Sequence, residues 1–238
     1  MKAIVFDSDG VLVDSMPSHY KAWKNAFKEV SDIDVDERTI YLLEGMRGID
    51  LVKKVFELKN YHGGNNNNNS NKQQQKKQIA DQVSERKNQI FRDILQSSPP
   101  KAYEGVRNLI VNLGDNCKKA VVSGSARKDV EILLEKALGK EKNLFDTLIT
   151  ADDSEKGKPD PSSFMAALDK NKISPSEALV VENAPLGVEA ANKAGIQCIV
   201  VLNNTPLTIQ DFKSVIGEDK ILKETRSATT VVQHWCDR

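Results

Sequence analysis

Residues 3–10 read AIVFDSDG, a short apolar run that ends in two aspartates and a glycine. A continuous apolar run of this length is typical of a strand that is buried on both faces, as strands of parallel sheets are. Similar runs recur at residues 119–122, 148–150, 178–181 and 197–202, and stretches of helical periodicity lie between the later runs, at 129–137, 162–171 and 186–194. Strands that alternate with helices predict an α/β fold with a doubly wound parallel sheet. In such sheets ligands bind beyond the carboxyl ends of the strands.

The first apolar run is followed by a long segment in which no second strand is expected. Residues 17–97 instead show helical periodicity, which predicts a helical cap domain inserted into the α/β core. Prolines at both ends of this segment, Pro17 and Pro99-Pro100, are suited to hinges. We therefore expect an α/β core of residues 1–16 and 98–238 and a cap of residues 17–97.

A low-complexity stretch interrupts the expected cap at about residues 63–78. It is rich in asparagine and glutamine and holds almost no apolar side chain. Such a stretch cannot bury enough apolar surface to offset its ordering entropy, so we expect a flexible loop between two cap helices. The alternative is a polar tract that aggregates or binds a partner.

Composition narrows the range of partners. The 34 basic and 34 acidic residues cancel, so nothing in the net charge calls for nucleic acid or a membrane surface. No run approaches the roughly 20 apolar residues of a membrane helix, and the N-terminus lacks a signal-peptide pattern. We expect a cytoplasmic protein, as a monomer or a weak homodimer, whose three widely spaced cysteines are reduced thiols.

The two aspartates after the first run, Asp7 and Asp9, are the strongest candidates for catalysis. In an extended chain their side chains would face opposite ways, but a turn at Gly10 can bring both towards one site. One carboxylate can then attack an electrophile while the other moves protons. Taken alone, the same pattern is equally typical of aspartates that merely form a turn.

Three later strand ends also carry polar groups. Ser123 and Gly124 follow the second strand, where exposed backbone N–H groups ahead of a helix suit an oxyanion. Lys158 lies in a proline-flanked turn, where its charge can bind phosphate and hold the two aspartates together. Glu182 and Asn183 end the fourth strand and offer oxygen ligands to a hard cation. Each pattern alone also fits a capped turn or a solvated lysine, but four of them in this order are specific.

The order and the residues of these four motifs resemble those of the haloacid dehalogenase superfamily. They are most similar to its β-phosphoglucomutase-like branch, which includes sugar-phosphate phosphatases. The resemblance covers nearly the whole chain, and only the Asn/Gln-rich stretch falls clearly outside it. It implies a Rossmann-like core with an inserted cap. The implied activity is that of a Mg²⁺-dependent phosphatase acting on a small phosphorylated metabolite, expected to be a sugar phosphate, through an aspartyl-phosphate intermediate.

The resemblance also implies a role for each motif residue. Asp7 would attack phosphorus, and Asp9 would protonate the leaving oxygen and then deprotonate water. Magnesium would bridge the Asp7 carboxylate, the Asp9 backbone carbonyl and the fourth motif. Ser123, the Gly124 amide and Lys158 would hold the transferring phosphoryl oxygens, so that catalysis rests mainly on positioning and charge neutralisation.

The fourth motif departs from most relatives, which carry an aspartate where this chain has Asn183. An amide oxygen can still coordinate Mg²⁺, but it supplies one negative charge fewer to the metal site. Glu182 could compensate, either directly or through a water molecule. We therefore expect Asp7, Asp9, Asn183 and Glu182 to form the metal site.

The cap is expected to select the substrate. His19 and Trp23 have the spacing of residues that line the cap–core cleft in β-phosphoglucomutase, and Arg47 lies in a turn from which it could reach the distal end of a substrate. A plain helix-face position for His19 and a plain core position for Trp23 are the alternatives, because Trp23 shares an apolar helical stripe with its neighbours.

Two other functions stay open at this point. A β-phosphoglucomutase-like mutase would use the same core but pass the phosphoryl group to a sugar hydroxyl instead of water. A non-catalytic protein that binds a phosphorylated ligand, or regulates a partner, could keep the fold without turnover.

Overall fold

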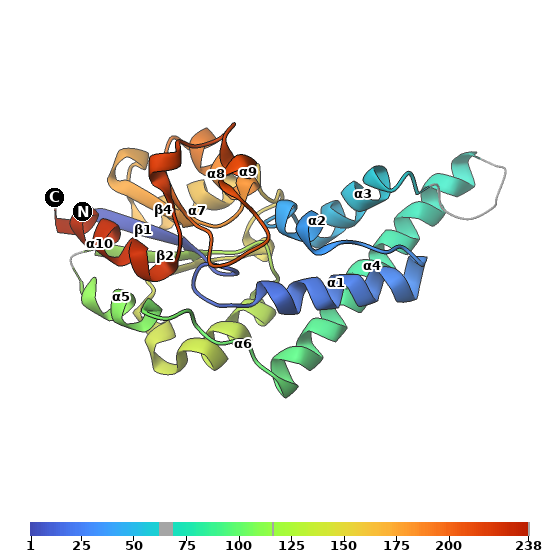
Figure 1. Ribbon diagram of the computed structural model, residues 1–238, viewed down its shortest axis with the longest axis horizontal. Coiled ribbons are helices and arrows are strands. Elements are labelled where there is room, and N and C mark those ends of the chain that lie inside the picture. Colours follow the sequence, from blue (N-terminus) through green and yellow to red (C-terminus); the bar gives the residue numbers. More distant parts are fainter. Residues whose placement is uncertain (62–68, 116, 238) are drawn as a thin grey trace.

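The computed structural model describes residues 1–61, 69–115 and 117–237, and for residues 69–72 it describes the backbone only (Figure 1). Within these residues six strands form one parallel sheet in the order β3-β2-β1-β4-β5-β6. The strands are β1 (Lys2–Asp7), β2 (Cys117–Val122), β3 (Thr147–Ile149), β4 (Ala178–Glu182), β5 (Gln197–Val201) and β6 (Ile221–Leu222). The predicted α/β class is thereby confirmed, and β6 is a short edge strand that the sequence patterns did not predict.

Helices cover both faces of the sheet. One face is packed by α5 (Val106–Asn112), α6 (Arg127–Leu138) and α10 (Thr225–Asp237), and the other by α7 (Ser162–Asn171), α8 (Pro185–Lys193) and α9 (Ile209–Phe212). Short 3₁₀ turns lie at η1 (Gly139–Leu144), η2 (Ala151–Asp153), η3 (Pro175–Glu177) and η4 (Glu218–Lys220). This two-sided cover explains why the strands read as continuous apolar runs.

The first strand occupies the middle of the sheet and pairs with β2 on one side and β4 on the other. Its side chains alternate between the two apolar layers: Ile4 and Phe6 join one cluster, whereas Ala3 and Val5 join the other. Asp7, the last residue of the strand, therefore reaches the carboxyl edge of the sheet at its centre. That edge is where ligands bind in open α/β sheets.

Between β1 and α5 the described residues form the helices α1 (Met16–Ser31), α2 (Glu37–Leu42), α3 (Gly48–Leu58) and α4 (Asn69–Ser97). We call residues 16–97 the helical insert. It extends from the side of the core opposite to the chain termini (Figure 1). The insert has an apolar core of its own, to which Trp23 and Phe27 of α1, Phe56 of α3 and Val83 of α4 contribute. Whether the insert is an independent domain with the predicted bounds stays a prediction.

The Asn/Gln-rich stretch was predicted as a loop at about residues 63–78, and for its second half this prediction was wrong. Helix α4 begins at Asn69, so residues 69–78 are helical. The physical reason is that glutamine and lysine, which fill residues 72–78, are good helix formers, and a long helix needs no apolar face along its whole length. Residues 62–68, which include the first asparagines, lie outside the described residues.

The expectation of three reduced thiols was also wrong. Cys117, at the start of β2, and Cys236, near the end of α10, form a disulfide with a Cα–Cα distance of 5.7 Å. Only Cys198 is a free thiol, and it is buried. The two paired cysteines are 119 residues apart in sequence, and it is the packing of α10 against the sheet that brings them together.

Candidate active site

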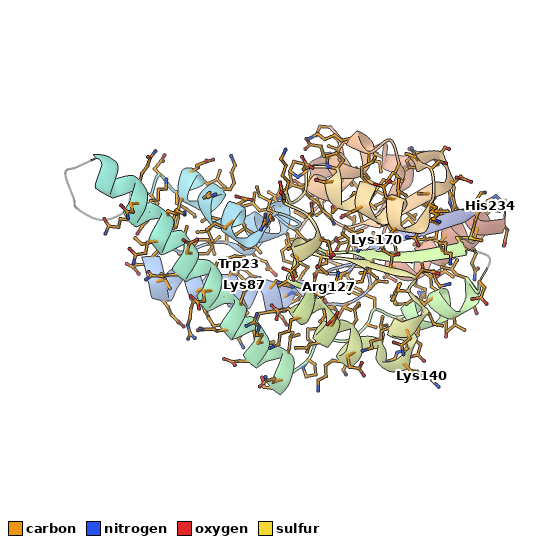
Figure 2. The ribbon with its side chains drawn as sticks, turned by 180° about the vertical axis from the view of Figure 1, so that it is seen from behind. Trp23, Lys87, Arg127, Lys140, Lys170 and His234 are labelled. Carbon is orange, nitrogen blue, oxygen red and sulfur yellow. A yellow bond between two sulfur atoms is a disulfide. The ribbon has the colours of Figure 1, made fainter. Side chains whose placement is uncertain are left out.

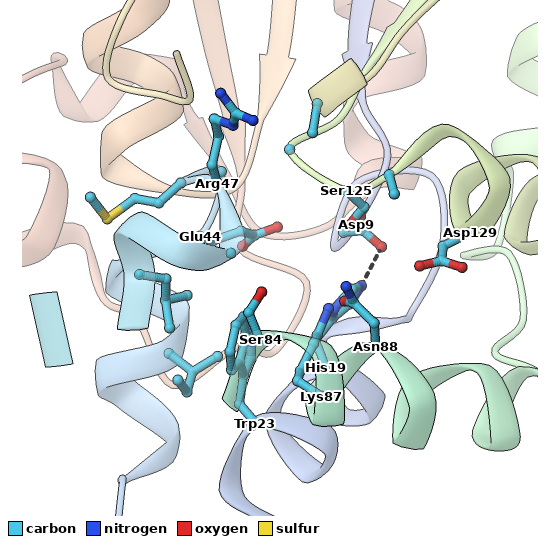
Figure 3. A pocket seen from close by; sticks show the side chains of 18 of the residues that line it. Asp9, His19, Trp23, Glu44, Arg47, Ser84, Lys87, Asn88, Ser125 and Asp129 are labelled. Atoms are coloured by element: carbon cyan, nitrogen blue, oxygen red, sulfur yellow. Dashed lines mark hydrogen bonds and ion pairs between the residues drawn. The ribbon is translucent and has the colours of Figure 1, made fainter. Parts of the chain in front are cut away.

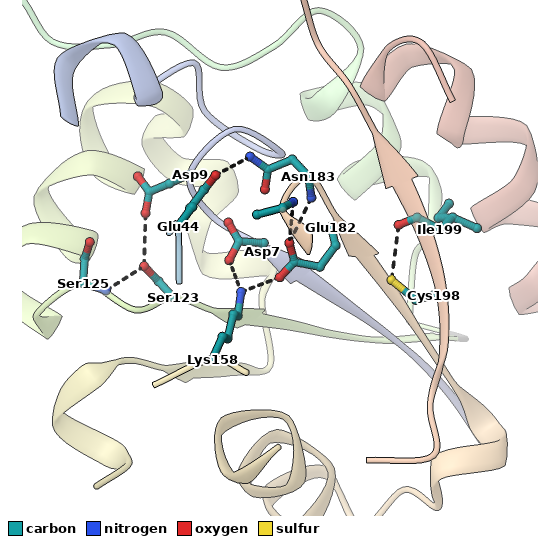
Figure 4. Close-up of polar contacts among 11 residues, drawn as sticks. Asp7, Asp9, Glu44, Ser123, Ser125, Lys158, Glu182, Asn183, Cys198 and Ile199 are labelled. Atoms are coloured by element: carbon teal, nitrogen blue, oxygen red, sulfur yellow. Dashed lines mark hydrogen bonds and ion pairs between the residues drawn. The ribbon is translucent and has the colours of Figure 1, made fainter. Parts of the chain in front are cut away.

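The carboxyl ends of β1 and β4 are joined by Lys158, which comes from the segment between β3 and α7. Its Nζ donates hydrogen bonds to Asp7 Oδ1 and, at 2.5 Å, to Glu182 Oε1 (Figure 4). All three side chains are buried. Burial alone would lower the pKa of Lys158, but the charges of Asp7 and Glu182 outweigh it and hold the pKa well above its ordinary value. The lysine therefore carries a fixed positive charge beside Asp7.

Asp7 is a strongly perturbed carboxyl group at the edge of the sheet. Burial raises its pKa to about 8, and repulsion from Glu182 and Asp9 adds to the rise against the attraction of Lys158. Loss of hydration disfavours the charged form of any buried carboxyl group. A second positive charge would be needed to keep Asp7 ionised at neutral pH.

Asp9 lies in a contrasting environment made of hydrogen-bond donors. Its Oδ1 accepts from Ser15 Oγ at 2.5 Å and contacts His19 Nε2 at 3.0 Å, and its Oδ2 accepts from Ser123 Oγ at 3.1 Å. Burial raises the pKa of Asp9, but the interactions with His19 and Ser15 outweigh burial and hold it below its ordinary range. The two aspartates of the first motif thus differ in ionisation, because burial outweighs the attraction of Lys158 at Asp7, whereas hydrogen-bond donors outweigh burial at Asp9.

His19, on helix α1, lines the cleft and contacts the Asp9 carboxylate, and its role in catalysis stays a prediction. Burial, together with the nearby charge of Lys87, lowers its pKa against the attraction of Asp9. A neutral ring must carry its proton on Nε2 in this position, since the Asp9 carboxylate can only accept. The ring also stacks on Phe91 of α4 with a centroid distance of 4.0 Å.

Glu182 is held by three donors. Besides Lys158, the backbone N–H groups of Asn183 and Ala184 donate to its Oε2 at 2.9 and 3.2 Å. Helix α8 leaves room for this carboxylate only because residue 187 is glycine: a Cβ there would lie 1.9 Å from Glu182 Oε1. Both oxygens of Glu182 accept hydrogen bonds, and Oε1, which accepts from Lys158, keeps a second lone pair that could coordinate a cation.

Asn183 is fully buried and meets a residue that the sequence patterns did not single out. Its Nδ2 donates to Glu44 Oε2 at 2.8 Å (Figure 4). Glu44 lies between α2 and α3 in the helical insert. Its neighbour Gly45 accepts a hydrogen bond from the Lys158 backbone N–H at 3.0 Å. The insert therefore reaches down onto the core at this point.

A cleft of about 280 Å³ opens between the insert and the carboxyl edge of the sheet. Asp7, Asp9 and Gly124 of the core and Glu44 of the insert are among the residues that line it, and Figure 3 shows the side chains of Asp9 and Glu44. Trp23 faces it from α1, so the predicted cleft position is found, although the same side chain also belongs to the apolar core of the insert.

Lys87 is a second cleft residue that sequence reasoning missed. It lies on α4, is only 6% exposed, and its Nζ stands 5.2 Å from the ring of Trp23 and 4.8 Å from that of Phe91 (Figures 2 and 3). Burial lowers its pKa to about 8, against the attraction of Asp9 and Asp129. Nothing local marks this lysine, which is one of many charged residues along a polar helix.

Arg47 occupies the rim of the cleft but turns away from it. Its Nη1 donates to the backbone carbonyl of Glu155, and in Figure 3 the side chain points away from Asp9 and Lys87. The predicted contact of Arg47 with the distal end of a substrate would therefore require this bond to break. Its role stays a prediction.

The oxygen groups around Asp7 can be compared with the needs of Mg²⁺. Among the described residues, no group of three or more His, Cys, Asp or Glu side chains is arranged to hold a metal ion. The set implied by the resemblance is different, because it mixes the Asp7 carboxylate, the Asp9 backbone carbonyl and the Asn183 amide oxygen. Asn183 Oδ1 is buried and has no hydrogen-bond partner among the described residues. A buried acceptor left open beside carboxylates fits a hard cation.

The fold and this edge of the sheet define a class of protein. The chain matches the haloacid dehalogenase-like hydrolases over residues 4–201, and it belongs to that family. It is 25% identical over 238 residues to the beta-phosphoglucomutase of Bacillus subtilis, a match that covers 98% of this chain and 94% of that protein. It is 26% identical over 201 residues to the phosphorylated carbohydrates phosphatase of Thermotoga maritima, with 84% of each chain covered.

A solved structure bears out the fold. The crystal structure of a HAD hydrolase of family IA from Entamoeba histolytica is similar to this chain with a TM-score of 0.76, at 22% identity and over 100% of both chains. None of the helices that the described residues build is both long and apolar enough to span a bilayer.

Proposed function

We propose that this protein is a Mg²⁺-dependent phosphatase that hydrolyses a small phosphorylated carbohydrate through a phosphoryl group carried on Asp7. The observation that carries the proposal is the meeting of Asp7, Asp9, Ser123 and Lys158, from three separate segments of the core, at one edge of the sheet beneath the cleft. Membership of the hydrolase family and two relatives named for phosphorylated carbohydrates or a phosphoglucomutase support the same reaction class.

The reaction would run in two displacements. In the first, the Asp7 carboxylate attacks phosphorus, the P–O bond to the sugar breaks, and Asp9 gives a proton to the leaving oxygen. Since the pKa of Asp9 is low in the free protein, it must take up that proton when the negative phosphoryl group binds beside it. In the second, Asp9 takes a proton from water, the water oxygen attacks phosphorus, and inorganic phosphate leaves Asp7 as a free carboxylate. Ser123 and His19, which bind Asp9, hold it in place for both proton transfers.

The electrostatics of the site support a requirement for a cation. With a pKa of about 8, Asp7 would be largely protonated at neutral pH, and a protonated carboxyl group is a poor nucleophile. Magnesium, when bound, supplies positive charge that lowers this pKa and neutralises the phosphoryl oxygens. Asp7 and the Asn183 amide oxygen would hold it, and Lys158 would bind the phosphoryl group.

Hydrolysis is preferred to the mutase reaction because of the charges that line the cleft. A mutase must hold a second phosphate group at the far end of its intermediate. Among the described lining residues, the lysine and arginine side chains are Arg47, which is bonded outside the cleft, and Lys87, which is buried against the rings of Trp23 and Phe91. A substrate with one phosphate and a neutral, hydroxyl-rich body suits this lining better than a bisphosphate.

The test is a panel of sugar monophosphates incubated with purified protein, with and without Mg²⁺. Released phosphate would be measured by a colorimetric assay and the sugar products by ³¹P NMR. We expect Mg²⁺-dependent phosphate release with at least one sugar phosphate. Isomerised sugar phosphate without phosphate release would establish the mutase instead, and ligand binding without either product would establish the non-catalytic alternative.

A further inference from the structure

Glu44 sits in a segment of the insert that is fitted closely to the core. A Cβ at the next residue, Gly45, would lie 2.5 Å from the Lys158 side chain, and a Cβ at Gly124 would lie 2.8 Å from the Gly45 carbonyl oxygen. The Gly45 carbonyl also accepts the Lys158 backbone N–H at 3.0 Å. The position of Glu44 is therefore set by two core segments at once.

The contact between Glu44 and Asn183 determines which way the amide faces. A carboxylate can only accept hydrogen bonds, so the Asn183 nitrogen must point at Glu44 Oε2, which it meets at 2.8 Å. The amide oxygen is then directed to the other side. There it is buried, since Asn183 is 0% exposed, and it has no hydrogen-bond partner among the described residues.

Glu44 has an open acceptor of its own. Its Oε1 is likewise buried without a hydrogen-bond partner in the described part of the chain. A buried oxygen that has lost its hydrogen bonds to water and gains none from the protein is unfavourable. Two unpaired oxygens among several carboxylates make an arrangement that positive charge would stabilise.

We propose that Glu44 is a positioning residue for the cation. It turns the Asn183 amide oxygen towards the metal position. Its carboxylate, which belongs to the insert, also supplies the negative charge that an aspartate at position 183 would have supplied. The inference rests on the proposed function, because it presumes a cation beside Asp7. Since Glu44 reaches Asn183 only when the insert lies against the core, cation affinity depends on closure. By thermodynamic linkage, the cation in turn favours the closed insert.

Two substitutions separate orientation from charge. Glu44→Gln keeps an oxygen that can accept from Asn183 but removes the charge, whereas Glu44→Ala removes both. Binding of Mn²⁺, used as a spectroscopic probe for Mg²⁺, is measured by the electron paramagnetic resonance signal of the free ion, which requires no turnover. We expect the Kd for Mn²⁺ to rise roughly fivefold in Glu44→Gln and more in Glu44→Ala. Glu57→Gln, an exposed glutamate at the end of α3, is the matched control and should bind as the unmodified protein does.

The same measurement in an Asn183→Asp background tests the charge argument. There the core itself supplies the carboxylate, and Glu44 would lie against a like charge. Glu44→Gln should then leave the Kd for Mn²⁺ unchanged or lower it. The loss of affinity that Glu44→Gln causes when residue 183 is asparagine would therefore disappear or reverse. A purely structural role of Glu44 would weaken binding in both backgrounds equally.

Two results would overturn the inference alone. Glu44→Gln and Glu44→Ala could both bind Mn²⁺ like the unmodified protein, or Glu44→Gln could weaken binding equally in the unmodified and the Asn183→Asp backgrounds. In either case the proposed function would stand, provided that the unmodified protein binds Mn²⁺ and hydrolyses a sugar phosphate. If the unmodified protein binds no Mn²⁺ at all, the inference and the cation requirement of the proposed function both fail.

Discussion

Lys158 donates a hydrogen bond to Glu182 at 2.5 Å while the same ammonium group contacts Asp7, so one buried cation joins the ends of β1 and β4. The ion pair between Lys158 and Glu182 has little room to move, because the Glu182 carboxylate lies directly over residue 187 of α8. Ion pairs of this kind are costly to break, since removing one partner leaves a buried charge uncompensated.

Gly187→Ala should disrupt this pair. Its Cβ would lie 1.9 Å from Glu182 Oε1, so the carboxylate must move away from Lys158. We expect a loss of about 1–3 kcal/mol in the free energy of unfolding, measured by urea denaturation, together with a large loss of activity. Gly217→Ala is the control, because its Cβ would meet only the exposed side chain of Asp219. Equal stability of both variants would refute the packing argument.

Asp7→Asn should abolish turnover while the fold remains. The amide has nearly the volume of the carboxyl group but is a poor nucleophile, so the rate of phosphate release should fall by about three orders of magnitude or more. Circular dichroism and the melting temperature report on the fold. Asp81→Asn, an exposed aspartate on α4, is the control. Substantial activity in Asp7→Asn would exclude the covalent mechanism.

Lys87→Met should stabilise the protein at pH 7. The pKa of Lys87 falls from its ordinary 10.5 to about 8 in the folded protein, mainly through burial. Between these pH values the unfolded chain keeps the proton that the folded chain has released, so the contribution of Lys87 to stability rises with pH. The stability gained by Lys87→Met should therefore be largest below pH 8 and shrink towards pH 10.5.

Urea denaturation at several pH values measures that difference. Lys77→Met, at an exposed position of the same helix, is the control and should show no such trend. A gain for Lys87→Met that does not change between neutral pH and the ordinary lysine pKa would mean that burial of the charge does not destabilise the folded protein.

The disulfide between Cys117 and Cys236 should be detectable in solution. Alkylation without reductant should modify Cys198 alone after unfolding, and mass spectrometry counts the modified thiols. Reduction should lower the melting temperature, because a link across 119 residues restricts the unfolded chain and typically contributes about 2–4 kcal/mol. Cys236→Ser should melt at the lower temperature with or without reductant. Alkylation of Cys117 and Cys236 in the unreduced protein would show that the bond does not form.

The sequence by itself determined the class of fold and most of the floor of the site. Apolar runs separated by helical stretches predict parallel strands, and the carboxyl ends of parallel strands must meet at one edge of the sheet. Polar residues that follow such runs, as Asp7, Ser123 and Glu182 do, are therefore brought together by the topology. That Asp9 and Asn183 lie with them follows from their short distance along the chain.

The tertiary structure alone decided what covers that floor. Glu44 and Lys87 come from a helical insert, and their position over the sheet depends on packing between segments that are far apart in sequence. No local pattern marks either residue. Packing likewise turned Arg47 outward and brought two distant cysteines into a disulfide. The physical reason is that strand order and helix periodicity are local properties of the chain, whereas the angle at which the insert meets the core is set by long-range contacts.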